Sequence, residues 1–261
     1  MGHLEAFTEA FHAHYSADPN ARVFLGLLDE LGELPDPSLE ATRERLANAR
    51  RLLAELTPLE ALDLHFDQRL DLRLARLKLE REIHDDSYVF NGQTRLVQLP
   101  TAGDSIGDGI FLIFINDPRP DLKRLSDIHA RIADVPRFLA GMLGRLNRPV
   151  ARWTRVDIDK CNALSELFET LLNWARDIDY PERESLEADA RAANEALSDY
   201  TQKLSELPTV DNIHVGEETM REILNRRGIV KSADELHGLA CDFLAETAAT
   251  VEALRAKLVQ K

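Results

Sequence analysis

Residues 58–88 read PLEALDLHFDQRLDLRLARLKLEREIHDDSY, and this stretch decides the fold class. Its apolar side chains recur at spacings of three and four residues, and we call them the leucine stripe: Leu59, Leu62, Phe66, Leu70, Leu74 and Leu77. Such spacing places apolar side chains on one side of an α-helix, while aspartate and arginine fill the other faces. The pattern predicts one long amphipathic helix over 58–88, with the leucine stripe facing the core.

Helical periodicity continues along the rest of the chain, with recognisable start signals. Asp18 and Pro19 suit an N-cap and a first helical position, and residues 57–60 (TPLE) and 232–235 (SADE) match the capping box. We expect Pro136 to kink or break the helix that contains it. The sequence therefore predicts an all-α fold, a multi-helix bundle of long amphipathic helices. The predicted helices cover 3–16, 19–32, 38–56, 58–88, 105–116, 120–147, 151–178, 182–206, 216–227 and 233–260.

Glycine and proline concentrate between residues 91 and 120, in contrast to the rest of the chain. They predict a long loop region here, with a short extended piece at 94–99 and a short buried helix at 110–115. The loop is either a functional lid or a plain connector. We expect a single helical domain over 1–261; if it is subdivided, we expect the boundary near 91–120. The residues concerned are Gly92, Pro100, Gly103, Gly107, Gly109, Pro118 and Pro120.

Composition limits the function classes. The chain has 261 residues, 44% of them hydrophobic, and a formal net charge of −14. Nucleic-acid binding needs a cationic surface, so we expect no nucleic-acid partner for this acidic protein. The apolar run 110–115 is far shorter than the about 20 residues that span a bilayer, so we expect no membrane partner. Residues 1–7 lack a signal-peptide pattern, and Cys161 and Cys241 suit reduced thiols, which together predict a cytoplasmic location.

One serine lies in a pattern that hydrolases use. Residues 103–107 read GDSIG, which matches the G-x-S-x-G nucleophile elbow. That elbow requires a strand-to-helix turn, and the chain shows no alternation of strands and helices. We therefore favour a loop in which Ser105 caps the next helix. An independent hydrolase stays an alternative, and it would need His129 or His214 within hydrogen-bond reach of Ser105.

A second pattern lies near the start of a predicted helix. Residues 214–218 read HVGEE, one residue short of the H-x-x-E-H zinc motif, because Glu218 stands where the second histidine would be. Gly216 favours a turn, so Glu217 and Glu218 would lie at the positive end of the following helix. We take His214, Glu217, Glu218 and Ser105 as candidate ligand-facing residues, and we assign no catalytic or metal-binding residue.

Two other groups could be mistaken for metal sites. His12 and His14 are two residues apart, so on a helix their side chains diverge and cannot share a metal. Asp63, Asp67 and Asp71 recur every four residues and share a helix face. This row either attracts a cation or, as we favour, pairs with arginine or lysine of neighbouring helices.

Three regions of the chain carry motifs that recur together in a known family. The first is Phe7 to Asp29, with its Asp18-Pro19 step, and the second is Leu125 to Leu139, where RIADVPRFL is similar to an R-L-x-x-I-P-x-x-L helix. The third runs from Ile213 to Leu236 and is similar to an I-G-x-E region, although Met220 stands where that region has an aromatic residue. In these three regions the chain resembles the N-terminal half of a bacterial family, domain of unknown function 885.

The resemblance implies a largely helical protein related to zinc-dependent gluzincin carboxypeptidases. The family's zinc motif lies in a C-terminal half that is not in this sequence, so no zinc ligand carries over to any residue here. We expect no cofactor in this chain, with zinc only in that missing half. The resemblance then implies a non-catalytic wall of a substrate cleft, inactive as an isolated chain. Its partner would be a complementary C-terminal half or a second copy. The alternative is a stand-alone helical scaffold or protein-interaction module.

Overall fold

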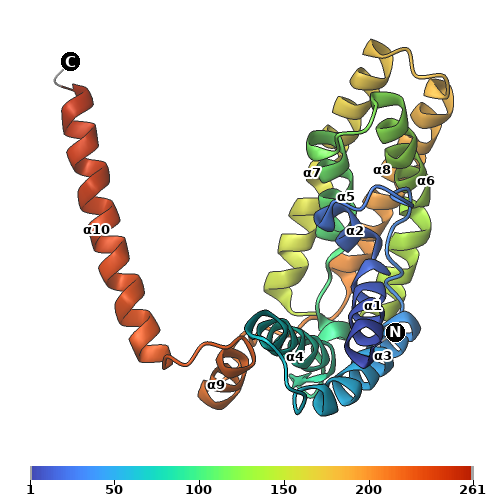
Figure 1. The fold of residues 1–261 in the computed structure, drawn as a ribbon. Coiled ribbons are helices and arrows are strands. Elements are labelled where there is room, and N and C mark those ends of the chain that lie inside the picture. Colours follow the sequence, from blue (N-terminus) through green and yellow to red (C-terminus); the bar gives the residue numbers. More distant parts are fainter. Residues whose placement is uncertain (1, 260–261) are drawn as a thin grey trace. The chain divides into compact units, whose positions relative to one another are not determined.

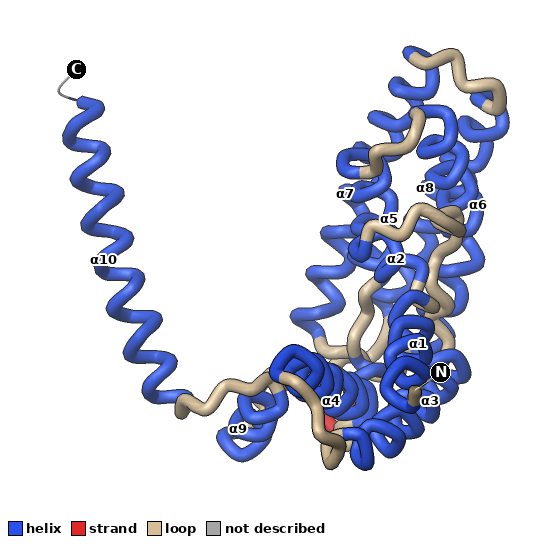
Figure 2. Tube along the Cα trace, in the orientation of Figure 1, coloured by secondary structure: helices blue, strands red, loops and turns tan. Residues whose placement is uncertain are grey.

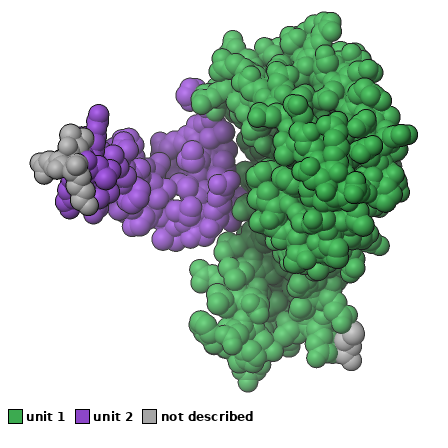
Figure 3. Space-filling view, turned by 90° about the horizontal axis from the view of Figure 1, so that it is seen from above, with its two compact units in different colours: residues 1–213 green, residues 214–261 purple. Residues whose placement is uncertain are grey.

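The structure is a computed structural model that describes residues 2–259, and it is almost entirely helical (Figures 1 and 2). The predicted all-α fold is confirmed. The chain groups into two compact units, Met1–Ile213 and His214–Lys261, coloured separately in Figure 3. Residues 91–120 lie within the first unit, and the expected single domain with a division in that region stays a prediction.

The regular elements follow one another with short connections. In the first unit they are α1 (His3–Ser16), α2 (Pro19–Leu25), α3 (Leu39–Leu59), α4 (Phe66–Ser87), β1 (Val89–Phe90), β2 (Gln93–Thr94), the 3₁₀ helix η1 (Arg95–Gln98), α5 (Ala102–Asn116), α6 (Asp121–Arg145), α7 (Ala151–Asp177) and α8 (Arg183–Glu206). In the second unit they are α9 (Glu217–Arg226) and α10 (Ala233–Val259). In the described residues, no helix is both long and apolar enough to cross a bilayer.

Four helices of the first unit, α5 to α8, run side by side as a bundle (Figure 1). They enclose the larger apolar core, in which Ile110, Ile132, Phe168 and Leu197 are buried. Helix α6 continues through Pro136, so of the kink or break that we expected there, the break is absent. The apolar stripes of α6, α7 and α8 recur at helical spacing, which is why sequence periodicity predicted these helices to within a few residues.

A second apolar cluster lies among α1, α3 and α4, and here the leucine stripe was predicted wrongly. Helix α4 buries Leu72, Ala75 and Leu79 instead, while Phe66 is 69% exposed and Leu74 is 55% exposed. Leucines alternate along this helix, so both of its faces look apolar in sequence. Periodicity alone could not determine which face packs against α3.

The helix predicted over 58–88 is also interrupted. Helix α3 extends to Leu59, so Thr57 and Pro58 lie in its last turn, and the Thr57 hydroxyl donates to the Leu53 carbonyl at 3.1 Å. The capping box predicted at 57–60 is therefore wrong. The chain instead starts α4 with a box in which the His65 and Gln68 side chains each pair with the other's backbone N–H.

The region 91–120 is more regular than expected. Asn91 and Gly92, both with positive φ, form the turn of a hairpin between β1 and β2. Helix α5 then begins at Ala102 rather than at Ser105, and its Ile106 and Ile110 are fully buried. The region is therefore a connector built around a buried helix, and the long irregular loop that we predicted is absent from it.

A buried arginine connects α6 to the start of the chain. Arg131 is fully buried and donates to the Leu31 carbonyl at 2.6 Å, the Pro19 carbonyl at 3.1 Å and Asn20 Oδ1 at 2.6 Å. The guanidinium passes so close to Gly109 of α5 that a Cβ there would overlap both Arg131 and Asn20. Burial lowers the pKa of Arg131 to about 10. This network fixes the segment around α2 against the bundle.

The second unit is sparsely packed. Ser232 and Glu235 form the capping box predicted for α10, with the Glu235 N–H donating to Ser232 Oγ at 3.1 Å and the Ser232 N–H donating to Glu235 Oε2 at 2.8 Å. Among the side chains of α10 that the structure describes, all but that of Leu236 are exposed. This helix therefore presents its apolar residues to solvent.

Candidate functional site

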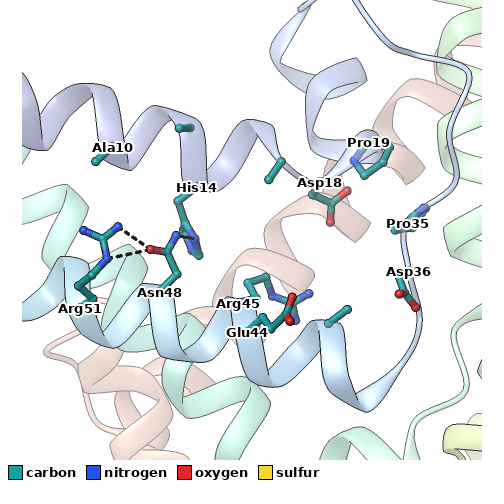
Figure 4. A pocket seen from close by; sticks show the side chains of 13 residues that line it. Ala10, His14, Asp18, Pro19, Pro35, Asp36, Glu44, Arg45, Asn48 and Arg51 are labelled. Carbon is teal, nitrogen blue, oxygen red and sulfur yellow. Dashed lines mark hydrogen bonds between the residues drawn. The ribbon is translucent and has the colours of Figure 1, made fainter.

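A groove of about 660 Å³ lies between α1 and α3, beside the loop that precedes α3 (Figure 4). Ala10, Ala13 and Ala17 recur along the α1 side, and Ala41 lines the groove from α3. Because alanine carries only a methyl group, the two helices leave space here instead of interdigitating. The polar side chains that line this space, the α1–α3 groove, are His14, Asp18, Asp36, Glu44, Arg45, Asn48 and Arg51.

His14 is a buried member of this lining, only 7% exposed. Arg51 donates to Asn48 Oδ1 at 2.6 Å, so the amide NH₂ of Asn48 faces His14 and donates to Nδ1 at 2.9 Å. The other ring nitrogen, Nε2, lies 2.9 Å from Glu82 Oε2. An acceptor at Nδ1 assigns the ring proton to Nε2, which donates to Glu82. Arg51 at the rim thus orients a histidine inside the protein.

Glu82 of α4 is the acceptor on which this network converges. Its Oε2 accepts from His14 and from the Tyr15 hydroxyl at 2.8 Å, and its Oε1 lies 3.2 Å from Arg45 Nε. Burial alone would raise the pKa of Glu82, but the hydrogen bonds from His14 and Tyr15 and the charge of Arg45 outweigh it, so the pKa is lowered. Glu82 is therefore an anion held by three donors from α1 and α3.

Arg45 of α3 connects this network to the groove. Its guanidinium pairs with Glu82 through Nε and with Asp86 through Nη2. Nη1 donates no hydrogen bond to any residue that the structure describes. About a third of the side chain, 37%, is exposed. Two carboxylates of α4 thus orient an arginine that still has donors for a ligand.

Charged and amide side chains provide the polar lining of the groove, and the described lining contains no serine, threonine or cysteine. Burial, followed by the charge of Glu82, raises the pKa of Tyr15, so this phenol stays protonated. Oriented charges of this kind suit recognition of a charged small molecule.

Ser105 lies outside this groove. It is in the first turns of α5, so the glycines at 103 and 107 are helical and the G-x-S-x-G elbow is not formed. The prediction that Ser105 caps this helix is wrong, because the helix starts three residues earlier. Its carbonyl accepts from Asn20 Nδ2 at 2.7 Å, which is a structural contact. In the described residues, no hydrogen bond joins Ser105 to a histidine.

The other three candidates lie in the second unit. Gly216, with φ +82, is the residue before α9, and Glu217 and Glu218 form its exposed first turn, as expected for acidic residues at this end. Glu217 pairs with Arg221 at 2.9 Å. His214 is exposed two residues before Gly216. Their role in facing a ligand stays a prediction.

The aspartate row is interrupted. Asp63 falls in the segment before α4, so only Asp67 and Asp71 share a face of that helix. Within the described part of the chain, no three His, Cys, Asp or Glu side chains are grouped so that they could hold a metal ion. The residues present therefore do not fit a zinc centre.

Sequence reasoning missed the roles of His14, Arg45 and Glu82. A signal existed for His14, because it lies seven residues after the buried Phe7 and so on the same face of α1. His129 has an ordinary structural role: it is buried and joins α6 to the start of α8 through Tyr180 at 3.2 Å and Asp189 at 2.8 Å. Both of its ring nitrogens are thereby engaged, which leaves none for the alternative with Ser105.

Comparison with known proteins gives a family and a fold. Residues 19–261 match the family described as "Bacterial protein of unknown function (DUF885)". No curated protein matches the chain significantly. A solved structure from Shewanella oneidensis, that of a candidate lipoprotein of unknown function, is similar over 87% of this chain with a TM-score of 0.65 and 17% sequence identity. The match covers 39% of that protein, so this chain spans about two fifths of its relative's length.

Proposed function

Because the chain belongs to the bacterial family of unknown function DUF885, we propose that it is the helical, non-catalytic part of a metallopeptidase-like protein. It forms one wall of the substrate cleft, with the α1–α3 groove as the surface that faces the substrate. The zinc of this protein is held by a complementary C-terminal half, and no residue of this chain is assigned to it. The cytoplasmic location stays a prediction.

The exposed apolar face of α10 carries this proposal. Along the helix, large apolar side chains face solvent, with Phe243 71% exposed and Leu258 74% exposed. An amphipathic helix is stabilised mainly by packing of its apolar face, and exposed faces of this size mark association surfaces. The complementary half is the proposed occupant, since the similar solved protein is more than twice as long as its matched region. The apolar face consists of Leu239, Phe243, Leu244, Val251, Leu254 and Leu258.

Cysteine labelling provides a direct test. Cys161 is fully buried in the core of the α5–α8 bundle, where burial raises the pKa of its thiol, so it should not label. Cys241 is exposed on α10 but lies two residues from both Leu239 and Phe243, so it points away from the apolar face. The probe is therefore Leu254→Cys, on the apolar face, combined with Cys241→Ser. The rate of maleimide labelling is measured for the chain alone and for the product of the coding region extended past residue 261. The chain alone should label within minutes and show no peptidase activity, and the extended product should label at least tenfold more slowly. Equal labelling of both proteins, or hydrolysis by the chain alone, contradicts the proposal.

A stand-alone scaffold is the second candidate, and the charge pattern of α10 favours it. The first half of the helix carries the acidic residues Asp234, Glu235, Asp242 and Glu246. Its last turns carry Arg255 and Lys257, together with Glu252, which pairs with Arg255 at 3.7 Å. Two antiparallel copies would place opposite charges side by side along the apolar face. Sedimentation of the chain alone distinguishes the two candidates. A scaffold that pairs through α10 is a concentration-dependent dimer, which Phe243→Asp returns to a monomer.

A further inference from the structure

We infer that the α1–α3 groove binds a small dipolar molecule, one that carries both an ammonium group and an anionic group such as a carboxylate. The ammonium group lies at the end formed by Asp18 and Asp36, and the anionic group lies at Arg45. This inference rests on the proposed function only in taking the groove as a ligand-facing surface. It names a ligand chemistry that neither the family nor the similar structure supplies.

The acidic end of the groove is preoriented. Asp18 Oδ1 accepts from the N–H groups of Asn20 at 2.8 Å and Ala21 at 3.1 Å, and Asp36 Oδ1 accepts from the Ser38 N–H at 2.8 Å. Each bond fixes a carboxylate but uses only one of its oxygens. The Oδ2 atoms make no hydrogen bond or ion pair with the described residues. Two fixed carboxylates with an open oxygen each are suitable acceptors for an ammonium group.

The basic part of the groove is preoriented as well. Asp86 and Glu82 hold two nitrogens of Arg45 from the α4 side, and Nη1 is left for a ligand oxygen. Arg51 adds a second positive charge further along α3, where Glu55 and Asn48 hold it at 2.6 Å each. Arginine presents several N–H groups in one plane, which matches a carboxylate.

The two charge types are concentrated in different parts of the groove, although Glu44 lies next to Arg45. Figure 4 shows Arg51 near Ala10 at one end, Asp18 and Asp36 at the other end, and Arg45 between them. A molecule with a single charge would pair with the groups at one end of the groove and leave the charged groups at the other end without a partner. A dipolar molecule satisfies both ends, so it should bind more tightly than either half.

The space sets the size of the molecule. A groove of about 660 Å³ is within the range of about 300–1,000 Å³ that is typical of small-molecule sites. Its alanine lining is apolar but shallow, so a short aliphatic linker between the two charges fits it better than a large ring system. A series of linear amino acids with increasing charge separation therefore probes the groove directly.

The test measures binding of glycine, 4-aminobutanoate and 6-aminohexanoate to the purified full chain by isothermal titration calorimetry. Hexanoate and hexylamine are the matched single-charge controls. At least one amino acid of the series should bind at least tenfold more tightly than both controls. Binding of none of the three, or equal binding of a single-charge control, overturns the inference.

Variants then locate the binding. Asp36→Asn keeps the oxygen that accepts from the Ser38 N–H but removes the charge. Arg51→Gln removes a positive charge without removing a partner of Arg45. Each should weaken binding of the best amino acid at least fivefold. The control variant Arg50→Gln changes an exposed residue of α3 outside the groove lining and should change binding less than twofold.

Equal losses in all three variants, or no loss in Asp36→Asn and Arg51→Gln, place the ligand elsewhere and overturn the inference. Thermal melts confirm that each variant is folded. Because binding is read on the chain alone, its failure leaves the α10 labelling experiment unaffected. A failure of that experiment likewise leaves the binding result standing.

Discussion

The carboxylate of Glu82 should contribute several kilocalories per mole to the free energy of unfolding of the first unit. Glu82→Gln keeps the shape but replaces one acceptor oxygen with an NH₂ group, so the donors from His14, Tyr15 and Arg45 compete for a single neutral oxygen. The Glu82 side chain is only 13% exposed, so water cannot fully replace the lost contacts. Hydrogen bonds to a charged group contribute about 1.5–3 kcal/mol each, and Arg45 retains Asp86. We expect a loss of about 2–4 kcal/mol in the free energy of unfolding.

The matched control is Glu80→Gln, two residues away on α4. Glu80 is 31% exposed and pairs with Arg76 at 3.5 Å, so its loss should cost less than about 1 kcal/mol. Both tryptophans, at 153 and 174, lie in α7, so urea unfolding followed by tryptophan fluorescence reports on the first unit alone. Equal destabilisation of the two variants, within about 0.5 kcal/mol, would refute the network as described.

Two further predictions concern the first unit. The pKa of Glu82 is lowered below its ordinary 4.5, so the Glu82 carboxylate stabilises the fold fully above pH 4.5, and this stabilisation is lost as the pH falls through the lowered pKa. In urea unfolding between pH 6 and pH 3, the free energy of unfolding should therefore decrease more for the natural chain than for Glu82→Gln. Gly109→Ala should cost about 2–4 kcal/mol, because its methyl group displaces the buried guanidinium of Arg131. In the control variant Gly144→Ala, the new methyl group has no atom within 4 Å, and the better helix propensity of alanine should raise the free energy of unfolding by up to about 1 kcal/mol. Similar melting temperatures for the two glycine variants would contradict this account.

Helix positions were predictable from sequence because they depend on local signals. The predicted helix 3–16 matches α1, and the predicted helices 151–178 and 233–260 match α7 and α10 to within one or two residues at each end. The error over 58–88 arises where local signals conflict. Pro58 and Thr57 read as a helix start, but α3 already extends through them, and the alternating leucines of α4 offered two equivalent apolar faces.

The candidate site was less predictable because its partners are remote in sequence. His14 and Glu82 are 68 residues apart, and nothing local at either position indicates the other. Ser105 drew attention through a motif whose chemistry requires a strand before it, and here a helix contains it instead. Motifs at fixed spacing identified residues, but only the packing of α1 on α3 and α4 brought His14, Arg45 and Glu82 together.

The central claim is that this chain is the non-catalytic part of its protein. The most direct measurement is the metal content of the purified full chain, by inductively coupled plasma mass spectrometry after incubation with zinc and removal of the unbound ion. The account predicts no stoichiometric zinc, because the described residues do not group three metal ligands. One tightly bound zinc ion per chain would contradict it.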